Sequence, residues 1–209
     1  TQTKLELKFL VDEKTETWTV FETLLPRTNI KVFLLGHPLF WTAEIYDMPK
    51  DSFRFASFSR AAVELAKKIK ADLVHCHDWH TALVPLMLKG TGLPTLITIH
   101  NVHPGTGLDQ ISVNELIKLS VDPSKFVKTK DDRPGMVSLL AQGVNSADFI
   151  TTVSPTHALE IQTAQFAGSL SELFRRRRDK LVGIINGIDT DVFDPTTDSD
   201  IIRPYSADD

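Results

Sequence analysis

The sequence predicts an α/β protein with a Rossmann-like, doubly wound and mostly parallel sheet. Short apolar runs, each ending in polar or turn-forming residues, recur along the 209-residue chain, and helical patterns separate most of them. Apolar runs without polar alternation are typical of strands buried on both faces of a parallel sheet. Five such strands are expected, at residues 31–36, 73–77, 95–100, 148–153 and 181–185.

Helical periodicity fills most of the intervals between these strands. Residues 53–69 place apolar side chains at spacings of three and four, with Arg54 and other charged residues between them, as in an amphipathic helix. Asp132 and Pro134 have the positions of an N-cap and a first-turn proline, and Ser154 and Pro155 repeat that arrangement. Further helices are therefore expected at residues 81–89, 113–119, 134–145, 154–161 and 170–178. Outside residues 113–119, the segment 101–133 is expected to be loop.

The amino-terminal segment follows a different pattern. Apolar and polar residues alternate around Leu7 and again from Trp18 to Glu22, on either side of the turn-like Asp12–Lys14. This pattern predicts a β-hairpin with one face in water. A doubly wound sheet usually opens instead with an apolar strand and a glycine-rich turn.

Composition excludes several classes of protein. The net charge of −4 argues against general nucleic-acid binding, and no apolar run is long enough to cross a membrane. Cys76 is the only cysteine, so no intrachain disulfide can form, which fits a reducing compartment. With 42% hydrophobic residues, the chain can bury a sizeable core. A chain of 209 residues forms one large domain or two small ones.

Polar side chains gather where two of the predicted strands end. Asp78 and His80 follow the strand at 73–77, and His100 and Asn101 close the next one. Ligands of doubly wound sheets bind just beyond the carboxyl ends of the strands. The sequence therefore predicts a polar ligand site at this edge of the sheet.

The same residues allow other interpretations. His75, His77 and His80 could ligate zinc, but HExxH and CxxC patterns are absent, and we expect no metal. Alternatively, His75 and Cys76 pack within the sheet, and Asp78 caps the next helix. The incomplete glycine motif at residues 105–107 and the four arginines at 175–178 are weak signals for a dinucleotide or a phosphate. Periodicity and spacing alone thus indicate a polar site without a defined chemistry.

Four segments, in this order and at this spacing, resemble the bacterial and plant glycogen and starch synthases: HCHDWHTALVPLML, TLITIHN, SADFITTVSPTHALEI and LVGIINGIDTDVFDP. The HPLFW stretch and the RFASFSRAAVEL helix are similar to that family too, so the resemblance covers about residues 18–195. It implies a single domain over residues 1–209, the amino-terminal, acceptor-side half of a GT-B fold. It also implies a location in the cytoplasm, or in a plastid if the source is a plant. It also implies a part in a retaining glucosyltransferase that extends α-1,4-glucan from ADP-glucose, with no cofactor beyond that donor.

The resemblance implies roles for individual residues. His100 would be catalytic, with its carbonyl facing the anomeric carbon of the donor glucose and its side chain at the 6-hydroxyl. Asn101 would hold the turn beside it. Asp78 and His80 would line the cleft, and Asn186 of NGID would reach the donor sugar.

Three further residues of these motifs have less definite roles. Trp79 is left open between stacking on a sugar face and packing in the core. Ser154 and Thr156 match the family motif but are expected to cap a helix.

The chain also departs from the family pattern. The opening strand with a Lys-x-Gly-Gly-Leu loop has no counterpart, so the first βαβ unit is expected to be missing, and so is the carboxy-terminal GT-B domain. Residues 102–107 stand where the family has Ala-Tyr-Gln-Gly. We therefore expect the α-glucan acceptor and these two absent parts as partners, and an inactive isolated chain. The alternative is a non-catalytic glucan-binding or regulatory module derived from such a domain.

Overall fold

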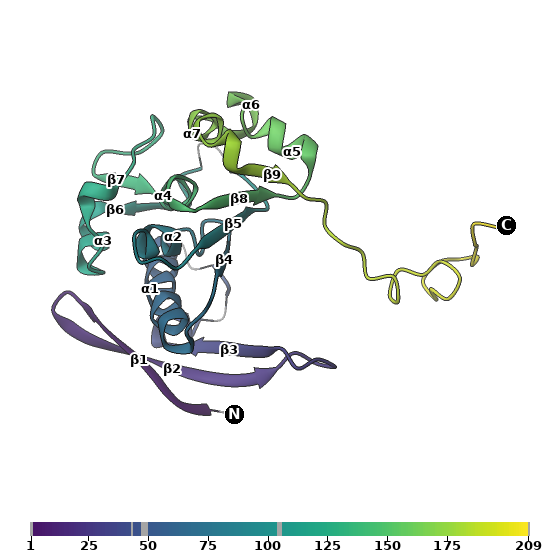
Figure 1. Ribbon diagram of the computed structural model, residues 1–209, viewed down its shortest axis with the longest axis horizontal. Coiled ribbons are helices and arrows are strands. Elements are labelled where there is room, and N and C mark those ends of the chain that lie inside the picture. Colours follow the sequence, from purple (N-terminus) through teal and green to yellow (C-terminus); the bar gives the residue numbers. More distant parts are fainter. Residues whose placement is uncertain (1, 43, 47–49, 104–105, 209) are drawn as a thin grey trace.

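The computed structural model describes residues 2–42, 44–46, 50–103 and 106–208, with only the backbone for residues 2–4. The described residues form three sheets with helices packed between and upon them (Figure 1). The strands are β1 (Gln2–Val11), β2 (Lys14–Leu24), β3 (Lys31–Gly36), β4 (Val74–His77), β5 (Thr95–Ile99), β6 (Gln110–Ser112), β7 (Met136–Ser138), β8 (Phe149–Thr152) and β9 (Leu181–Gly183).

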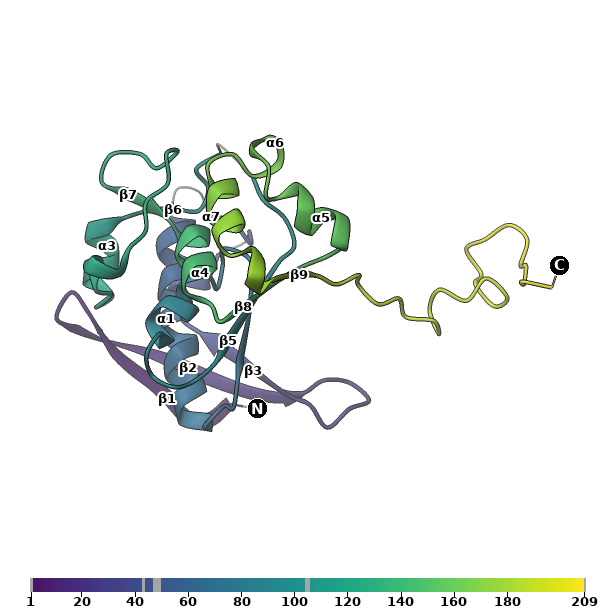
Figure 2. The ribbon, with the colours of Figure 1, turned by 45° about the horizontal axis from the view of Figure 1, so that its top comes forward.

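The helices connect and cover these strands. They are α1 (Asp51–Ile69), α2 (Leu83–Leu88), α3 (Val113–Lys118), α4 (Leu139–Ser146), α5 (Pro155–Glu160), α6 (Ala164–Ala167) and α7 (Leu170–Arg176), with short 3-10 turns at Pro38–Phe40, Pro123–Lys125 and Arg178–Lys180. No helix in the described ranges is both long enough and apolar enough to cross a membrane. Beyond β9 the chain leaves the body as a tail without helix or strand (Figure 2).

The predicted parallel sheet is confirmed in the order β4-β5-β8-β9. All three of its strand pairs are parallel, with His77 opposite Thr98 and Thr98 opposite Thr151. The carboxyl ends of the four strands therefore lie at one edge. The expected hairpin is confirmed as well: β1 and β2 pair antiparallel around Asp12 and Glu13, which both have a positive φ.

β3 was expected in the parallel sheet, and that prediction is wrong. Residues 31–36 form a strand, but it pairs antiparallel with β2 and extends the hairpin to a three-stranded sheet. This sheet buries Leu7, Trp18 and Val20 against α1, which Figure 1 shows lying across it. An apolar run indicates a strand but does not identify its neighbour, and it does not prove burial on both faces, since Leu34 is 55% exposed.

The prediction for residues 101–145 is also wrong in part. β6 and β7 form a two-stranded antiparallel sheet inside the predicted loop and helix, and α4 begins at Leu139 rather than at Pro134. The N-cap is Ser138, whose hydroxyl accepts the Ala141 N–H at 3.0 Å. Asp132 instead binds Thr129, at 2.8 Å from both its backbone nitrogen and its hydroxyl.

Helices α2, α4 and α7 cover one face of the parallel sheet. Their apolar residues join Cys76, Ile97 and Ile150 in a common buried cluster. Gly143 allows α4 to approach α2 closely, because a Cβ at this position would lie 2.7 Å from the Cβ of Ala82. Only glycine permits such an approach without moving a helix. The contact fixes the start of α2, and so the residues just after β4, against the sheet.

Arg54 lies inside the protein, whereas the amphipathic pattern placed it on a solvated helix face. Its side chain is 2% exposed, and its Nε donates to the carbonyl of Leu39 at 2.9 Å. Nη1 donates to Asp51 Oδ1 at 2.5 Å and to the carbonyl of Ile45 at 3.3 Å. The buried guanidinium thus organises the segment after β3, because it satisfies carbonyls that have no strand or helix partner there.

The other face of the parallel sheet is open over the described residues. Phe149 and Val182 lie on it and are 53% and 51% exposed. β4 pairs only with β5, so its other edge carries backbone groups without a strand partner in the described part of the chain. Parallel sheets are normally covered on both faces, and unpaired strand edges recruit other strands.

We therefore predict that the 209-residue chain self-associates in solution through the β4 edge and this open face. Size-exclusion chromatography should give species larger than the monomer at micromolar concentration, and Phe149→Ser should shift the distribution toward the monomer. Phe166→Ser is the matched control, because Phe166 is an exposed phenylalanine of α6 outside this sheet. A stable monomer with strongly protected β4 amides in hydrogen exchange would contradict the prediction.

Candidate active site at the strand ends

Asp78 joins the ends of β4 and β5. Its Oδ1 accepts the backbone N–H of His100 at 2.7 Å and that of Asn101 at 3.5 Å. Its own N–H donates to the carbonyl of Thr98 at 2.9 Å. Asp78 has a φ of 51°, in the left-handed region that few non-glycine residues adopt. Such strained residues persist where the surrounding contacts hold them, and here the contacts fix the His100 backbone. The interpretation of Asp78 as a cap of the next helix is wrong, because α2 has no side-chain cap.

Three histidines lie together on the open face of the sheet. His77 Nδ1 is 2.9 Å from His100 Nε2, and the two rings stack with centroids 5.2 Å apart. The ring of His75 stacks on that of His77 with centroids 4.4 Å apart. The Nε2 atom of His75 is 2.6 Å from Thr98 Oγ1. His75 is exposed, so the alternative that it packs within the sheet is wrong.

Burial and the repulsion of neighbouring imidazoles disfavour the charged forms of His75 and His77. The pKa of His75 is lowered by burial and then by the charges of His77 and His100. Burial and the charge of His100 also lower the pKa of His77, although Asp78 opposes this. Because these two groups bind a proton less readily in the folded than in the unfolded protein, they stabilise the fold fully above their unfolded pKa of 6.5. That contribution is lost as the pH falls from 6.5 through the folded pKa values.

Cys76 points away from the three histidines, into the core. It is 2% exposed and belongs to the buried cluster under the helices. Burial raises the pKa of its thiol to about 12. The alternation of β4 thus places imidazoles on one face and an inert thiol on the other.

His80 is enclosed by aromatic side chains. Its ring stacks on Trp79 with centroids 4.3 Å apart and meets the edge of Phe55 at 4.6 Å. Tyr46 Oη is 3.1 Å from His80 Nε2. Burial lowers the pKa of His80, against the opposing charges of Asp78 and Asp51. His80 is therefore held neutral, in an environment that also fixes Trp79.

Trp79 packs in the core, which is one of the two roles that the sequence left open, and it also lines a hollow. It packs against the buried clusters on either side of α2. It also lines a hollow of about 340 Å³ together with Tyr46, Asp51, His103 and Leu108. An aromatic wall with polar side chains at its rim is suited to a sugar ring. Sequence reasoning missed Tyr46 and Asp51, although the buried Arg54 that holds their segment was visible as a charge inside an apolar helix pattern.

The structure does not bring all the expected site residues together. Asn101 is exposed beside His100, whereas Asn186 lies in the tail after β9, and no hydrogen bond joins it to the other candidates within the described ranges. Ser154 caps α5 as expected, since its hydroxyl accepts the His157 N–H at 2.9 Å. Pro104 and Gly105, part of the segment that departs from the family pattern and of the incomplete glycine motif, lie outside the described residues.

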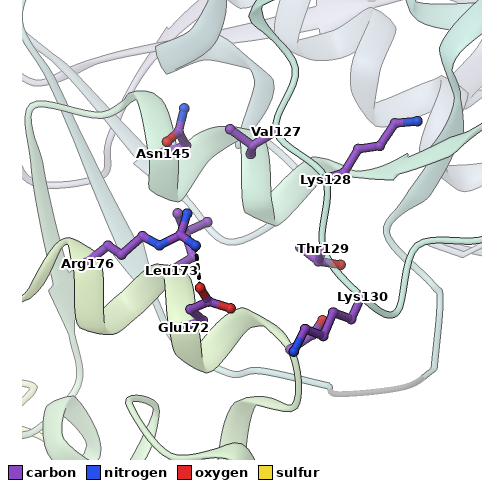
Figure 3. Close-up of a pocket in the computed structure, with 9 residues that line it drawn as sticks. Val127, Lys128, Thr129, Lys130, Asn145, Glu172, Leu173 and Arg176 are labelled. Carbon is purple, nitrogen blue, oxygen red and sulfur yellow. Dashed lines mark hydrogen bonds and ion pairs between the residues drawn. The ribbon is translucent and has the colours of Figure 1, made fainter.

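A larger hollow, of about 430 Å³, lies apart from these residues between α4, α7 and the segment 127–130 (Figure 3). Arg176 and Glu172 face each other within it as an ion pair. Arg177, the next residue of the arginine run, donates to the carbonyls of Asn145 and Ala147 at 2.5 Å each. These two arginines therefore have local structural partners, at the end of α4 and on α7 itself.

Metal ligation is not supported by the geometry. Within the described ranges, no group of three or more histidine, cysteine, aspartate or glutamate side chains is arranged to hold a metal ion. His77 and His100 bind each other, and Cys76 faces the core.

Asp78→Ala should loosen the turn at His100. The substitution removes the oxygen that accepts the His100 N–H. It also places alanine, which has no side-chain oxygen to stabilise this conformation, at a positive φ. Together these effects should lower the free energy of unfolding by about 1–3 kcal/mol. Asp78→Asn is the matched control, because it keeps an acceptor oxygen and tolerates this backbone conformation. Urea unfolding and hydrogen exchange of the His100 amide measure the effect. Equal His100 exchange in both variants and the parent would contradict the role of the carboxylate.

Comparison with known proteins identifies the family. A family model described as the starch synthase catalytic domain matches residues 1–176. The glycogen synthase of Jannaschia sp. (strain CCS1) is 42% identical over 168 residues, which cover 77% of this chain and 34% of that protein. The glycogen synthase of Gloeobacter violaceus is 35% identical over 189 residues, with coverages of 89% and 38%. The chain thus spans little more than a third of the length of these two relatives.

A solved structure shows the same architecture. The catalytic domain of starch synthase IV from Arabidopsis thaliana, bound to ADP and acarbose, superposes with a TM-score of 0.83 at 27% identity. The superposition covers 100% of this chain and 45% of that chain. The parallel sheet with its antiparallel amino-terminal hairpin is therefore part of a GT-B amino-terminal half. By sequence and by fold, this chain belongs to the starch synthase catalytic domain family.

Proposed function

We propose that this chain is the acceptor-side part of a retaining glucosyltransferase that extends α-1,4-glucan from ADP-glucose. The observation that carries the proposal is the junction of Asp78 and His100, which lies at the strand ends where ligands of such sheets bind. The relatives named above are glycogen synthases, and the similar solved domain was bound to ADP and acarbose, a nucleotide and a saccharide. These ligands support a nucleotide-sugar donor and a glucan acceptor for this chain as well.

His100 is the proposed catalytic residue. Asp78 fixes its backbone through a carboxylate–amide hydrogen bond of 2.7 Å, and its side chain is exposed at the sheet edge, where a donor sugar would lie. A carbonyl and an imidazole held in advance can stabilise the positive charge that develops at the anomeric carbon. Asn101 continues this turn, and Asn186 would reach the sugar from the start of the tail.

Trp79 and His80 are proposed to serve the acceptor. They form one wall of the hollow with Tyr46, and the ring of Trp79 is partly exposed there. The apolar face of a glucose unit stacks well on indole, and exposed lining groups such as the Tyr46 hydroxyl would bind its hydroxyls.

Two further parts complete the proposed enzyme. A strand beside β4 with its helix would cover the open face, and a second domain would face the strand ends and hold most of the nucleotide. The length of the relatives supports both parts, as does the free edge of β4 among the described residues. No metal is included, because helix ends and cationic side chains of such a second domain can neutralise a diphosphate.

A non-catalytic glucan-binding module is the second candidate. The hollow beside Trp79 favours it, because its described lining comes from this chain alone. The two candidates differ in the complete protein: a module binds glucan without transferring glucose.

The isolated 209-residue chain should not transfer glucose from ADP-glucose to glycogen. It lacks the proposed second domain, and the loss of most transition-state contacts removes nearly all of a rate enhancement that is commonly 10⁶-fold or more. Incorporation of labelled glucose into glycogen is the measurement, with the complete enzyme as positive control. Steady incorporation by the isolated chain would contradict the assignment of the donor site to a second domain.

In the complete enzyme, His100→Ala should lower kcat by about 10²-fold or more, as expected for the loss of a transition-state contact. His157→Ala is the control, because His157 lies on α5 and pairs with Glu160 there. Its loss should affect kcat much less. Wild-type turnover of the His100 variant, or a change in thermal stability alone, would assign His100 to packing.

A further inference from the structure

His77 and His100 form a close pair of imidazoles. Their ring nitrogens are 2.9 Å apart, which is the distance of a hydrogen bond, and one of the two must donate while the other accepts. A doubly protonated pair would place two donors against each other. The bond therefore fixes His100 Nε2 in one role and leaves Nδ1 of that ring for another partner.

His77 is itself held firmly by its surroundings. Its backbone N–H donates to Thr81 Oγ1 at 2.7 Å, and the same hydroxyl donates back to the His77 carbonyl at 2.8 Å. Its ring stacks on His75, which lies 2.6 Å from Thr98 Oγ1 through Nε2. The Thr98 hydroxyl is in turn 2.6 Å from that of Thr151. The Thr81 hydroxyl thus fixes the backbone of His77, whereas His75 only stacks beside its ring and is itself held by the threonines of β5 and β8.

The two ends of the pair are also tied together through the backbone. Asp78 follows His77 directly, and its carboxylate binds the N–H of His100. The His100 side chain is therefore restrained by residue 77 and its backbone by residue 78. The charged or titratable side chains around the His77 ring are His75 and Asp78 on its own strand segment and His100 at the end of β5. Burial and the charge of His100 lower the pKa of His77, which favours the neutral state that the bond requires.

We propose that His77 is a positioning residue that holds the His100 imidazole in one orientation and one tautomer, with Nδ1 directed to the sugar donor. The inference rests on the catalytic role proposed for His100. A ring without this restraint would rotate about its side-chain bonds and exchange its proton between the two nitrogens. A misplacement of about 1 Å in a catalytic group can cost 10²-fold in rate.

The test compares three variants of the complete enzyme. His77→Leu removes the hydrogen bond, whereas His77→Asn retains an amide near the position of Nδ1. His75→Leu is the matched control, because His75 lies on the same strand and face but has no hydrogen bond to His100. We expect His77→Leu to lower kcat about 10- to 100-fold with little change in the KM for glucan. His77→Asn should recover most of that loss, and His75→Leu should stay within a few-fold of the parent.

Nitrogen-15 NMR of histidine-labelled enzyme gives a readout that a merely structural role would not move. The ring nitrogens of His100 should show a single tautomer in the parent and in His77→Asn, and an averaged signal in His77→Leu. An unchanged His100 tautomer in His77→Leu, or equal kcat losses for His77→Leu and His75→Leu, would overturn the inference.

The outcome for His100→Ala separates the two proposals. If His100→Ala retains turnover, the proposed function of His100 fails whatever His77 does. If His100→Ala is inactive while His77→Leu keeps both rate and tautomer, only the positioning role of His77 fails.

Discussion

The carboxylate of Asp78 binds the backbone amide of His100 and thereby connects the ends of two parallel strands. No hairpin joins the ends of parallel strands, and here the side-chain bond of Asp78 adds to the backbone ladder in fixing their relative positions. Asp78 does this from a left-handed backbone conformation, which turns the chain away from β4 and toward α2. Gly143 then holds the start of α2 close to α4. The geometry of His77, His80 and His100 follows from these two constraints.

The second organising group is the buried guanidinium of Arg54. A buried charge is tolerated only when it is paired and hydrogen-bonded, and Arg54 meets both conditions through Asp51 and the carbonyls of Leu39 and Ile45. The segment that it holds carries Tyr46, whose hydroxyl reaches His80. The hollow beside Trp79 is thus built by a side chain that does not line it. Helix α1 thus packs on the three-stranded sheet and, through Arg54, also holds the segment that reaches the ends of the parallel strands.

The sequence predicted much of this arrangement, and its failures have physical reasons. Periodicity located β4, β5 and α1, and the convergence of parallel strand ends placed Asp78 near His100. Periodicity could not give the sheet of β3, because an apolar run does not identify the neighbouring strand. It also missed the burial of Arg54, which depends on carbonyls up to 15 residues away. The predicted start of α4 was wrong because Ser138, and not Asp132, is the N-cap of this helix. The contact between His77 and His100 joins side chains 23 residues apart, and no local pattern reports it.

Cys76 has a practical consequence for the study of this chain. The only thiol of the sequence is sealed beneath the helices, with a pKa of about 12, and is almost entirely protonated at neutral pH. Reagents that react with thiolates will therefore not modify Cys76 in the folded protein. A cysteine introduced in the tail beyond β9 can carry a fluorophore or spin label without removal of the native one. With a second cysteine introduced on the sheet, the distance between tail and sheet becomes measurable on a protein that keeps its native thiol.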